Sequence, residues 1–423
     1  MKKRNKEVTV MLNMNTLRIP DQMRLSKKAW PIVYVQPKDL DLWHASSGVA
    51  SLVGDTLGTA IKRVHNKSIN GQVLLKVHIG EPNCITRMRP EFVVGSWHQR
   101  FLREMGASGI VVGDTTVAYS GPRGHKKNPV GHASKYLRLA WKHGWSRKGK
   151  AGVPFVVLDR PVTAKSDEFE FIKEDICFKI EGIKNFKTFY VAGGFAAADF
   201  VVNHAHLTLH GLAGMAGCVK SIAMGCSGLN GKLQMHQSLL PHFDAKLCVG
   251  CGQCVESCPE DALQLNEGNT CPTVNPESCI GCGECEAVCT VGQGAIKLRG
   301  EEITNWDRGG QTLPVRMADY IIGLMNGRWD NVVHILHMYA VTNRCDCVNS
   351  KQKPFLEKDL GFLIGKNPFA VDRLATKLLA EALQKQGHNN DETFLKSTKN
   401  SSGYVHATYG IITEVPIEKI SIS

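Results

Sequence analysis

Short apolar runs alternate with amphipathic stretches along most of the chain. Runs typical of buried strands cover residues 73–77, 109–112, 153–158, 189–192, 200–203 and 332–338, and patterns typical of helices cover 89–106, 132–143, 317–326 and 370–386. This alternation predicts an α/β fold with a mostly parallel sheet. The polar stretch from His388 to Gly403 predicts a mobile linker before a short C-terminal tail.

The length of 423 residues is typical of two or three domains. No apolar run approaches the roughly 18 residues that a membrane span needs, so we expect no span. The basic N-terminus lacks the apolar segment of a secretory signal, and we therefore expect a cytoplasmic protein.

Fifteen cysteines are the most informative part of the composition. Eight of them form two copies of the pattern C-x2-C-x2-C-x3-C, namely Cys248, Cys251, Cys254 and Cys258, then Cys279, Cys282, Cys285 and Cys289. Three cysteines at this spacing on a tight loop wrap three irons of a 4Fe-4S cluster, and the fourth reaches the partner cluster. The pattern thus predicts one cluster on Cys248, Cys251, Cys254 and Cys289 and another on Cys279, Cys282, Cys285 and Cys258. Two structural zinc sites are the alternative, but cysteines packed this densely suit zinc poorly.

Residues 244–299 resemble the bacterial two-cluster ferredoxin module, an α+β unit. Thr290 follows Cys289 where the ferredoxin pattern has a proline. Outside this stretch the chain resembles a family of uncharacterised iron–sulfur centre proteins, in which a domain of unknown function carries an inserted two-cluster ferredoxin module. The resembling segments are residues 76–83, 113–124, 198–236 and 345–372.

The resemblance implies one α/β domain that is interrupted by the ferredoxin-like module, and it supplies no particular reaction. We expect an N-terminal segment at 1–70, the first part of the α/β domain at 71–243, the module at 244–299, the second part of the domain at 300–387, and the linker and tail at 388–423.

A second site is predicted in the α/β domain. Asp114 ends an apolar run and Arg123 follows on a turn-rich loop, where open α/β sheets bind ligands. Six glycines between residues 211 and 231, close to Lys220, favour either a close approach to a phosphate or flat ring, or close packing against the sheet. We expect Asp114, Arg123, His204 and Lys220 to bind a cofactor, for which a flavin or deazaflavin is our candidate.

Cys345 and Cys347 flank Asp346, so both thiols would face one side of an extended strand. With other histidines and cysteines of the domain they form either a further metal site or a thiol pair close to the clusters. The alternative is that these side chains belong to the core or to the surface. The other residues concerned are His204, His206, His210, Cys218, Cys226 and His236.

The net charge of +12 is unevenly distributed. Residues 244–299 contain eight acidic and three basic side chains, whereas residues 121–150 contain nine basic side chains and no acidic one. The basic stretch predicts a negatively charged partner, and we favour an acidic redox protein, such as a ferredoxin or flavodoxin, or an anionic cofactor. Nucleic acid is less favoured, because no recognised motif accompanies the stacking potential of Trp141 and Trp145.

These features favour an iron–sulfur electron-transfer protein or oxidoreductase. In this hypothesis two 4Fe-4S clusters pass electrons between an external carrier and a site in the α/β domain. Two alternatives come from other functional classes. One is a nucleic-acid-binding protein with structural clusters, and the other is an assembly or scaffold factor for a client redox enzyme.

Overall fold

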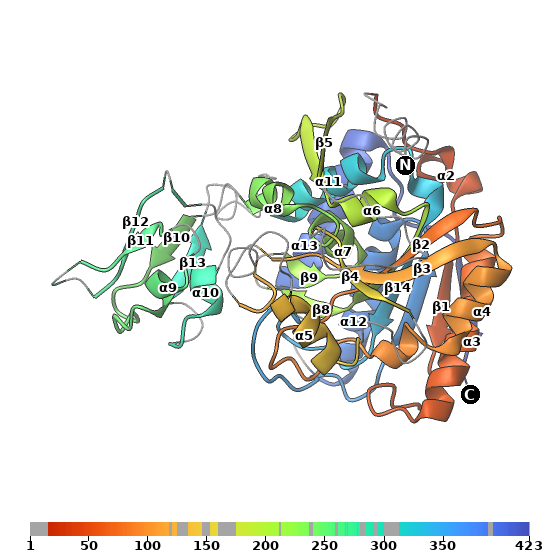
Figure 1. Cartoon of the computed structure of the whole chain (residues 1–423), viewed down its shortest axis with the longest axis horizontal. Helices are drawn as coiled ribbons and strands as arrows, with labels where there is room; N and C mark the ends of the chain where they lie inside the picture. Colours follow the sequence, from red (N-terminus) through yellow and green to blue (C-terminus); the bar gives the residue numbers. More distant parts are fainter. Residues whose placement is uncertain are drawn as a thin grey trace.

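Strands that are buried on both faces build the centre of the molecule. The computed structural model describes residues 16–117, 121–124, 134–145, 153–159, 175–210, 213–236, 240–258, 261–266, 268, 270–276, 278–279, 284–291, 295–299, 313–387 and 392–422. Eight strands form one sheet (Figure 1), in the order β16 (Ile417–Ser421), β1 (Ile32–Gln36), β15 (Gly361–Gly365), β14 (Val332–Met338), β7 (Phe200–His206), β2 (Gly71–Lys76), β3 (Ala107–Asp114) and β4 (Phe155–Val157).

The sheet is mixed but mostly parallel. Only β15 runs against its neighbours, β1 and β14, while the pairs β1–β16, β14–β7, β7–β2, β2–β3 and β3–β4 are parallel. Nearly every residue of β2, β7, β14 and β15 is buried, which is typical of strands covered on both faces. The predicted α/β fold with a mostly parallel sheet is confirmed.

One predicted strand lies outside the large sheet. Residues 189–192 fall almost wholly in β6 (Thr188–Val191), which pairs antiparallel with β5 (Ile176–Lys179) in a two-stranded sheet of its own. Burial alternates along β6, because one face of this hairpin is partly open, whereas the central strands are continuously buried. The apolar pattern therefore found the strand but not its partner.

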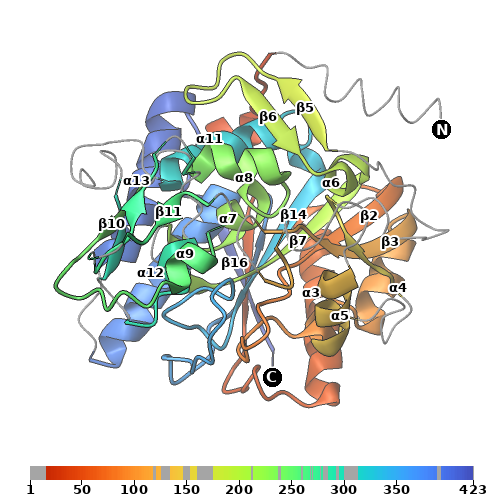
Figure 2. The same cartoon turned by 60° about the vertical axis from the view of Figure 1, so that its left-hand side comes forward.

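Helices cover both faces of the large sheet, and Figure 2 separates the two layers. One face carries α3 (Ser47–Val64), α4 (Ser96–Glu104) and α5 (Ser134–Lys142), and the other carries α6 (Gly193–Ala197), α7 (Cys218–Ala223), α8 (Leu229–His236), α11 (Leu313–Met325), α12 (Pro368–Lys385) and α13 (Glu392–Tyr409). Alternate strand residues serve the two layers: Val73 and Leu75 pack toward α3, and Leu74 packs toward α11. None of the helices in the described ranges has the length and apolar character needed to cross a membrane.

Shorter elements complete the body of the molecule. They are α2 (Asp21–Arg24), the 3₁₀ turns η1 (Ser26–Lys28), η2 (Pro90–Phe92) and η4 (Trp329–Asn331), and the hairpin of β8 (Thr208–His210) with β9 (Gly214–Ala216). The long helix predicted at 89–106 is thus divided into η2 and α4, and Gly95 is the N-cap of α4. The helix predicted at 370–386 begins two residues earlier, where the Asn367 side chain accepts the N–H groups of Phe369 and Ala370.

The expected linker at 388–403 is instead mostly helix. Residues 388–391 lie outside the described part of the chain, and α13 begins at Glu392. The prediction of a linker was wrong because the stretch is polar and its pattern gives little sign of the tertiary contacts that the helix makes. Val405 and Tyr409 are buried against α11, and the Thr398 hydroxyl lies 3.0 Å from that of Thr376 in α12.

Both ends of the described chain join the sheet. The segment expected to precede the α/β domain supplies β1 and α3, and the expected tail supplies β16. The strands β1 and β16 pair in parallel from Ile32 opposite Ile417 to Gln36 opposite Ser421. The α/β body therefore extends beyond the boundaries 71 and 387 that the sequence suggested.

A small lobe projects from one side of this body in Figure 1. It consists of β10 (Leu240–Phe243), α9 (Gln253–Glu256), β11 (Leu263–Gln264), β12 (Thr273–Val274), α10 (Glu284–Ala287) and β13 (Ile296–Arg299). β10 pairs antiparallel with β13 and so joins the two ends of the lobe, and β11 pairs antiparallel with β12. Its small core combines Leu263 and Ile296 with Cys254 and Cys285.

Two glycine substitutions test the helix packing. A Cβ on Gly323 of α11 would overlap the Phe189 ring, whereas a Cβ on Gly403 of α13 would meet nothing within 4 Å. We expect Gly323→Ala to lower the free energy of unfolding, since overpacking costs about 1–3 kcal/mol, more than the gain in helix propensity. Gly403→Ala should raise it by up to about 1 kcal/mol. Urea unfolding checks both, and a destabilised Gly403→Ala variant would contradict the helix assigned to α13.

Candidate functional site

Buried polar side chains gather where the parallel strands end. Lys76 is the last residue of β2, Asp114 the last of β3 and His206 the last of β7, and the side chains of all three are buried. Because these strands are parallel, their carboxyl ends meet at one edge, which is where open α/β sheets bind ligands. We call this group, with the residues that contact it, the carboxyl-edge cluster.

Asp114 is the most heavily bonded member of the cluster. Its Oδ1 accepts from Lys76 Nζ at 3.1 Å and from the Thr115 N–H at 2.9 Å. Its Oδ2 accepts from the Tyr136 hydroxyl at 2.7 Å and from Arg123 Nη2 at 3.2 Å. Burial alone would raise the pKa of Asp114, but Lys76 and Arg123 hold it well below its usual range. Asp114 is therefore a buried carboxylate between two cations.

Arg123 links Asp114 to the loop that follows β2. Its Nη1 donates to Glu81 Oε1 at 2.9 Å and lies 3.1 Å from His78 Nε2. The Arg123 side chain is only 2% exposed, as is that of Asp114. The structure thus brings together two of the four residues predicted to bind a cofactor, and their charged groups contact other protein groups.

A turn after β14 lies beside this cluster and is fixed by Asp346. Asp346 Oδ2 is 2.7 Å from His206 Nδ1, and its Oδ1 accepts from the Cys84 thiol at 3.2 Å. The Glu81 N–H donates to the Asp346 carbonyl at 3.0 Å. Burial would raise the pKa of Asp346, but His206 lowers it to about 2. The turn is therefore tied to the ends of both β7 and β2.

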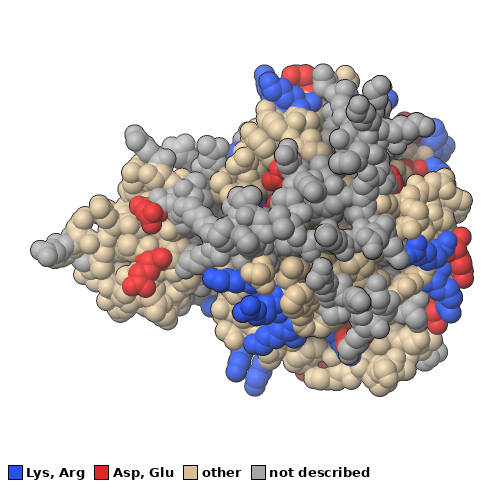
Figure 3. All heavy atoms as spheres, viewed as in Figure 1, with Lys and Arg blue, Asp and Glu red and all other residues tan. Residues whose placement is uncertain are grey.

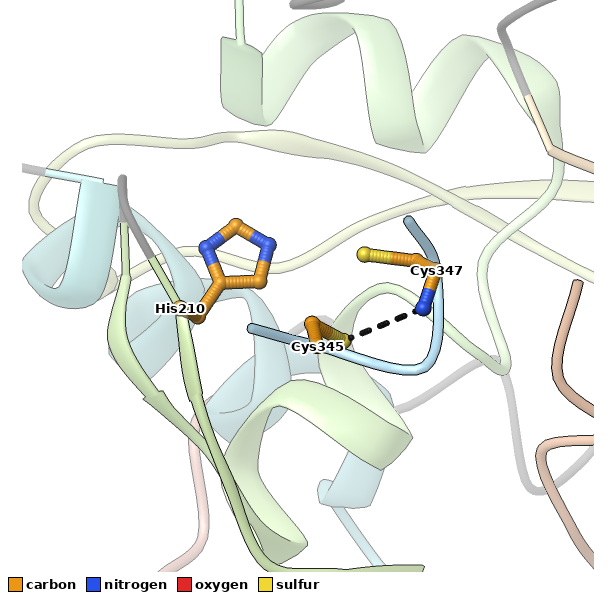
Figure 4. Close-up of side chains that lie close together, drawn as sticks. All are labelled: His210, Cys345 and Cys347. Carbon is orange, nitrogen blue, oxygen red and sulfur yellow. Dashed lines mark hydrogen bonds between the residues drawn. The ribbon is translucent and has the colours of Figure 1, made fainter. Parts of the chain in front are cut away.

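Lys220, the third predicted residue, contacts Cys345 in this turn. Its Nζ lies 3.5 Å from Cys345 Sγ, and the Cys347 N–H also donates to that sulfur at 3.4 Å. The interaction with Cys347 and the Lys220 charge lower the pKa of the Cys345 thiol to about 5, against the effect of burial. Figure 4 shows His210 facing the same pair, and one atom each of His210, Cys345 and Cys347 lies within 4.8 Å of the others.

His204, the fourth predicted residue, lies apart from the cluster. Its Nδ1 is 2.9 Å from His337 Nε2, and the His337 ring packs edge-on against Phe362. Side chains alternate along β7, so His204 faces the layer of α3, opposite to Asn203, which contacts α7. Of the other candidates, Cys218 and Cys226 are fully buried among hydrophobic side chains, and burial raises the pKa of both thiols.

The glycines near Lys220 serve close packing. A Cβ on Gly225 would meet Lys76 Nζ at 2.6 Å, and one on Gly231 would overlap the Tyr320 hydroxyl. At the start of α7, the N–H groups of residues 218 and 219 donate to the Asp372 carboxylate at 2.7 and 2.9 Å. A carboxylate of the protein itself thus occupies the place where a phosphate would bind.

In the lobe, four cysteines surround one hollow. Cys248, Cys251 and Cys254 line it together with Cys289, which follows α10 in the second run, and its empty space is about 350 Å³ including the open mouth. These are the four residues that the sequence predicted as ligands of one cluster. The loop turns at Gly250 and Gly252, whose φ angles of +66° and +72° favour glycine.

The second predicted set is described only in part. Cys282 lies outside the described residues. Cys285 is buried beside Cys254 in the core of the lobe, and Cys258 packs against the same core. The Ala262 N–H donates to Cys258 Sγ at 3.2 Å, which is a favourable contact for a thiolate.

A family comparison covers most of these residues. A family model, the domain of unknown function DUF362, matches residues 73–377. The chain belongs to this family. The DUF362 match begins in β2 and ends in α12, so it includes the carboxyl-edge cluster and the lobe and leaves out β1, α3, α13 and β16. No curated protein and no solved structure matches the chain.

Sequence reasoning missed several residues of the two sites. In the DUF362 domain, Lys76 stands at the end of an otherwise apolar strand, and such a buried charge needs a partner. That signal was present in the sequence, whereas nothing in it pointed to Tyr136 or Cys84. In the lobe, Cys271 forms a side-chain hydrogen bond with Cys248, although it belongs to neither cysteine pattern.

The surface of the DUF362 protein is electrically uneven. Lys135, Arg138 and Lys142 of α5 are exposed, and Figure 3 shows basic side chains gathered over this part of the body and acidic ones on the lobe. The rest of the basic stretch, residues 125–133 and 146–150, lies outside the described residues. Trp145 is 1% exposed and unavailable for stacking on bases, whereas Trp141 is 44% exposed.

The Asp114 carboxylate makes a testable contribution to stability. We expect Asp114→Asn to lower the free energy of unfolding by about 3–5 kcal/mol, because Lys76 would be left buried without a carboxylate. Since the folded pKa of Asp114 is depressed, its contribution is present above the unfolded pKa near 4 and is lost as the pH falls.

Urea unfolding at pH 7 measures this effect. Asp39→Asn is the matched control, because Asp39 pairs with Lys358 at an exposed position, and it should unfold like the wild type. An Asp114→Asn variant as stable as this control would contradict the role of Asp114.

Proposed function

We propose that this DUF362 protein is an iron–sulfur electron-transfer protein or oxidoreductase, in which the lobe carries two 4Fe-4S clusters that connect an external carrier with the carboxyl-edge cluster. The observation that supports it most strongly is the hollow lined by Cys248, Cys251, Cys254 and Cys289. Cysteines far apart in the sequence converge there in the combination that a two-cluster ferredoxin requires.

The residues around the hollow fit such a group. Four thiolates at one hollow are the donor set of a 4Fe-4S cluster. Glycine at positions 250 and 252 lets the loop pass close to the sulfurs, and Val249 and Val291 contribute apolar surface. Cys258, Cys279, Cys282 and Cys285 would hold the second group. Each cluster, when bound, gains or loses one electron, at a potential set by the protein around it.

A short connection leads from the lobe to the body. Glu286 of α10 lies close enough to Arg344 for the arginine charge to act on its carboxyl group: burial raises the pKa of Glu286, and Arg344 lowers it. Arg344 directly precedes Cys345 in the turn after β14, beside the carboxyl-edge cluster. The second cysteine run therefore approaches the same turn that Lys220 contacts.

The charge distribution supports an acidic redox partner for the body. The exposed cations of α5 would attract a ferredoxin or a flavodoxin, and such steering favours rapid, weak encounters. A flavin or deazaflavin in the α/β domain would make the protein a complete oxidoreductase. Cytoplasmic location fits free thiols, which a reducing compartment preserves.

Iron analysis of the wild type and of two cysteine variants tests the proposal. Protein purified without oxygen should contain about eight irons and eight sulfides per chain, with visible absorption that dithionite bleaches reversibly. Cys254→Ser should lose about half of the iron, because Cys254 would hold one cluster. The control is Cys177→Ser, since Cys177 is an exposed cysteine of β5 and should not affect the iron content.

Three outcomes separate the alternatives. Zinc in place of iron, without a visible chromophore, would refute the proposal. Equal iron in the Cys254→Ser and Cys177→Ser proteins would refute the assignment of the ligands. Release of a flavin or deazaflavin on denaturation would identify the cofactor of the α/β domain.

A further inference from the structure

The turn after β14 brings two thiols together. The Val348 N–H donates to the Cys345 carbonyl at 2.9 Å and closes a four-residue turn that includes Cys347. Residues two apart in such a turn have Cα atoms roughly 5–6 Å apart, inside the range that a disulfide accepts. The two sulfur atoms lie within 4.8 Å of each other, so we expect rotation about the side-chain bonds to bring them to bonding distance.

The residue between the cysteines is anchored away from them. Asp346 binds His206 and Cys84 through its carboxylate and Glu81 through its carbonyl. These contacts hold the turn in place whether the two sulfurs are joined or separate. A change of oxidation state is therefore confined to the side chains of Cys345 and Cys347.

The electrostatic surroundings suit one thiolate and one thiol. Lys220 Nζ supplies one positive charge 3.5 Å from Cys345 Sγ, which balances a single thiolate. The interaction with Cys345 and burial raise the pKa of the Cys347 thiol, which therefore keeps its proton beside the thiolate. Cys345 is buried and Cys347 only partly so, which makes Cys347 the sulfur that a small thiol or disulfide reaches first.

His210 adds a proton donor and not a metal ligand. The Ala213 N–H donates to His210 Nδ1 at 3.1 Å, so this nitrogen carries the lone pair and the proton of the neutral ring is on Nε2. The other ring nitrogen, Nε2, is turned toward Cys347 Sγ in Figure 4. An N–H in this position faces the sulfur, whereas a metal would need the lone pair there.

We propose that Cys345 and Cys347 form a redox-active dithiol–disulfide pair, which is the two-electron centre of the carboxyl-edge cluster. Oxidation forms the bond between the two sulfurs and releases two electrons and the thiol proton of Cys347. Reduction consumes two electrons, breaks that bond, leaves Cys345 as a thiolate beside Lys220, and returns one proton to Cys347. The idea that the two 4Fe-4S clusters deliver these electrons one at a time rests on the proposed function. The dithiol–disulfide couple itself does not depend on that function.

Trypsin offers a direct test, because it cuts after Arg344 and Lys351 and so releases residues 345–351 with both cysteines. The full chain is equilibrated without oxygen in mixtures of reduced and oxidised dithiothreitol and then treated with iodoacetamide. After digestion with trypsin, the masses of the peptides are measured by mass spectrometry. Under reducing conditions we expect two labels on this peptide. Under oxidising conditions we expect no label and a mass lower by two hydrogens. The exposed Cys177 should carry one label throughout.

Substitution of Lys220 tests the thiolate. Lys220→Met should slow the labelling of the reduced pair at pH 7 by about tenfold, because the thiolate fraction falls. Lys220→Arg should restore most of the rate, since it keeps the charge. Lys142→Met is the control at an exposed lysine and should label at the wild-type rate.

Two results would overturn the inference. One is a peptide 345–351 that takes up two labels at every dithiothreitol ratio. The other is one equivalent of zinc or additional iron that the wild type retains and that Cys345→Ser loses. The Cys254→Ser protein separates the two proposals: reversible oxidation of the pair in that protein supports the couple irrespective of the clusters. Clusters without a reversible couple would refute this inference alone.

Discussion

The arrangement of charge at the carboxyl edge depends on one buried carboxylate. Asp114 stands at the end of β3, a strand that is paired on both sides in a sheet covered on both faces, where an isolated charge would be prohibitively costly. Lys76 and Arg123 compensate it from two other parts of the chain. Arg123 in turn reaches Glu81, whose backbone holds the Asp346 turn. The position of Cys345 thus follows from the charge balance around Asp114.

The same contacts tie separate segments of the carboxyl edge together. Two of the links are buried ion pairs of Arg123, with Asp114 and with Glu81, and the third is the backbone hydrogen bond from Glu81 to Asp346. Such bonds are stronger in a low-dielectric interior than on the surface. The chain of contacts from Asp114 through Arg123 and Glu81 to Asp346 joins the ends of β3 and β2 to the turn after β14. A redox centre benefits from such a frame, because reorganisation on electron transfer is then limited to the sulfurs and nearby protons.

The lobe and the body have opposite electrical character. The lobe is acidic and holds its cysteines in a small core, whereas the body presents exposed cations on α5. The charge of Arg344, the residue before Cys345, acts on the carboxyl group of Glu286 in the lobe and lowers its pKa against the effect of burial.

The sequence alone determined the features that repeat locally. Continuous apolar runs identified the strands β2, β3, β4, β7 and β14, because a strand covered on both faces has no polar face to obscure it. The spacing of the cysteines identified the four that line one hollow, since that spacing follows from the geometry of a tight loop. Periodicity failed for α13, which is held by tertiary contacts to α11 and α12 more than by its own pattern.

Only the tertiary structure decided which distant residues meet. Asp114 and Arg123 were predicted as one site and do meet, but Lys76, Tyr136 and Asp346 join the cluster from segments that carry no shared motif. His204 and His206 share one side of β7, but only His206, at the carboxyl end of the strand, reaches the cluster, whereas His204 contacts His337. Local patterns of charge and hydrophobicity can be seen in the sequence. Which buried charges compensate one another depends on how the strands of the whole sheet are arranged.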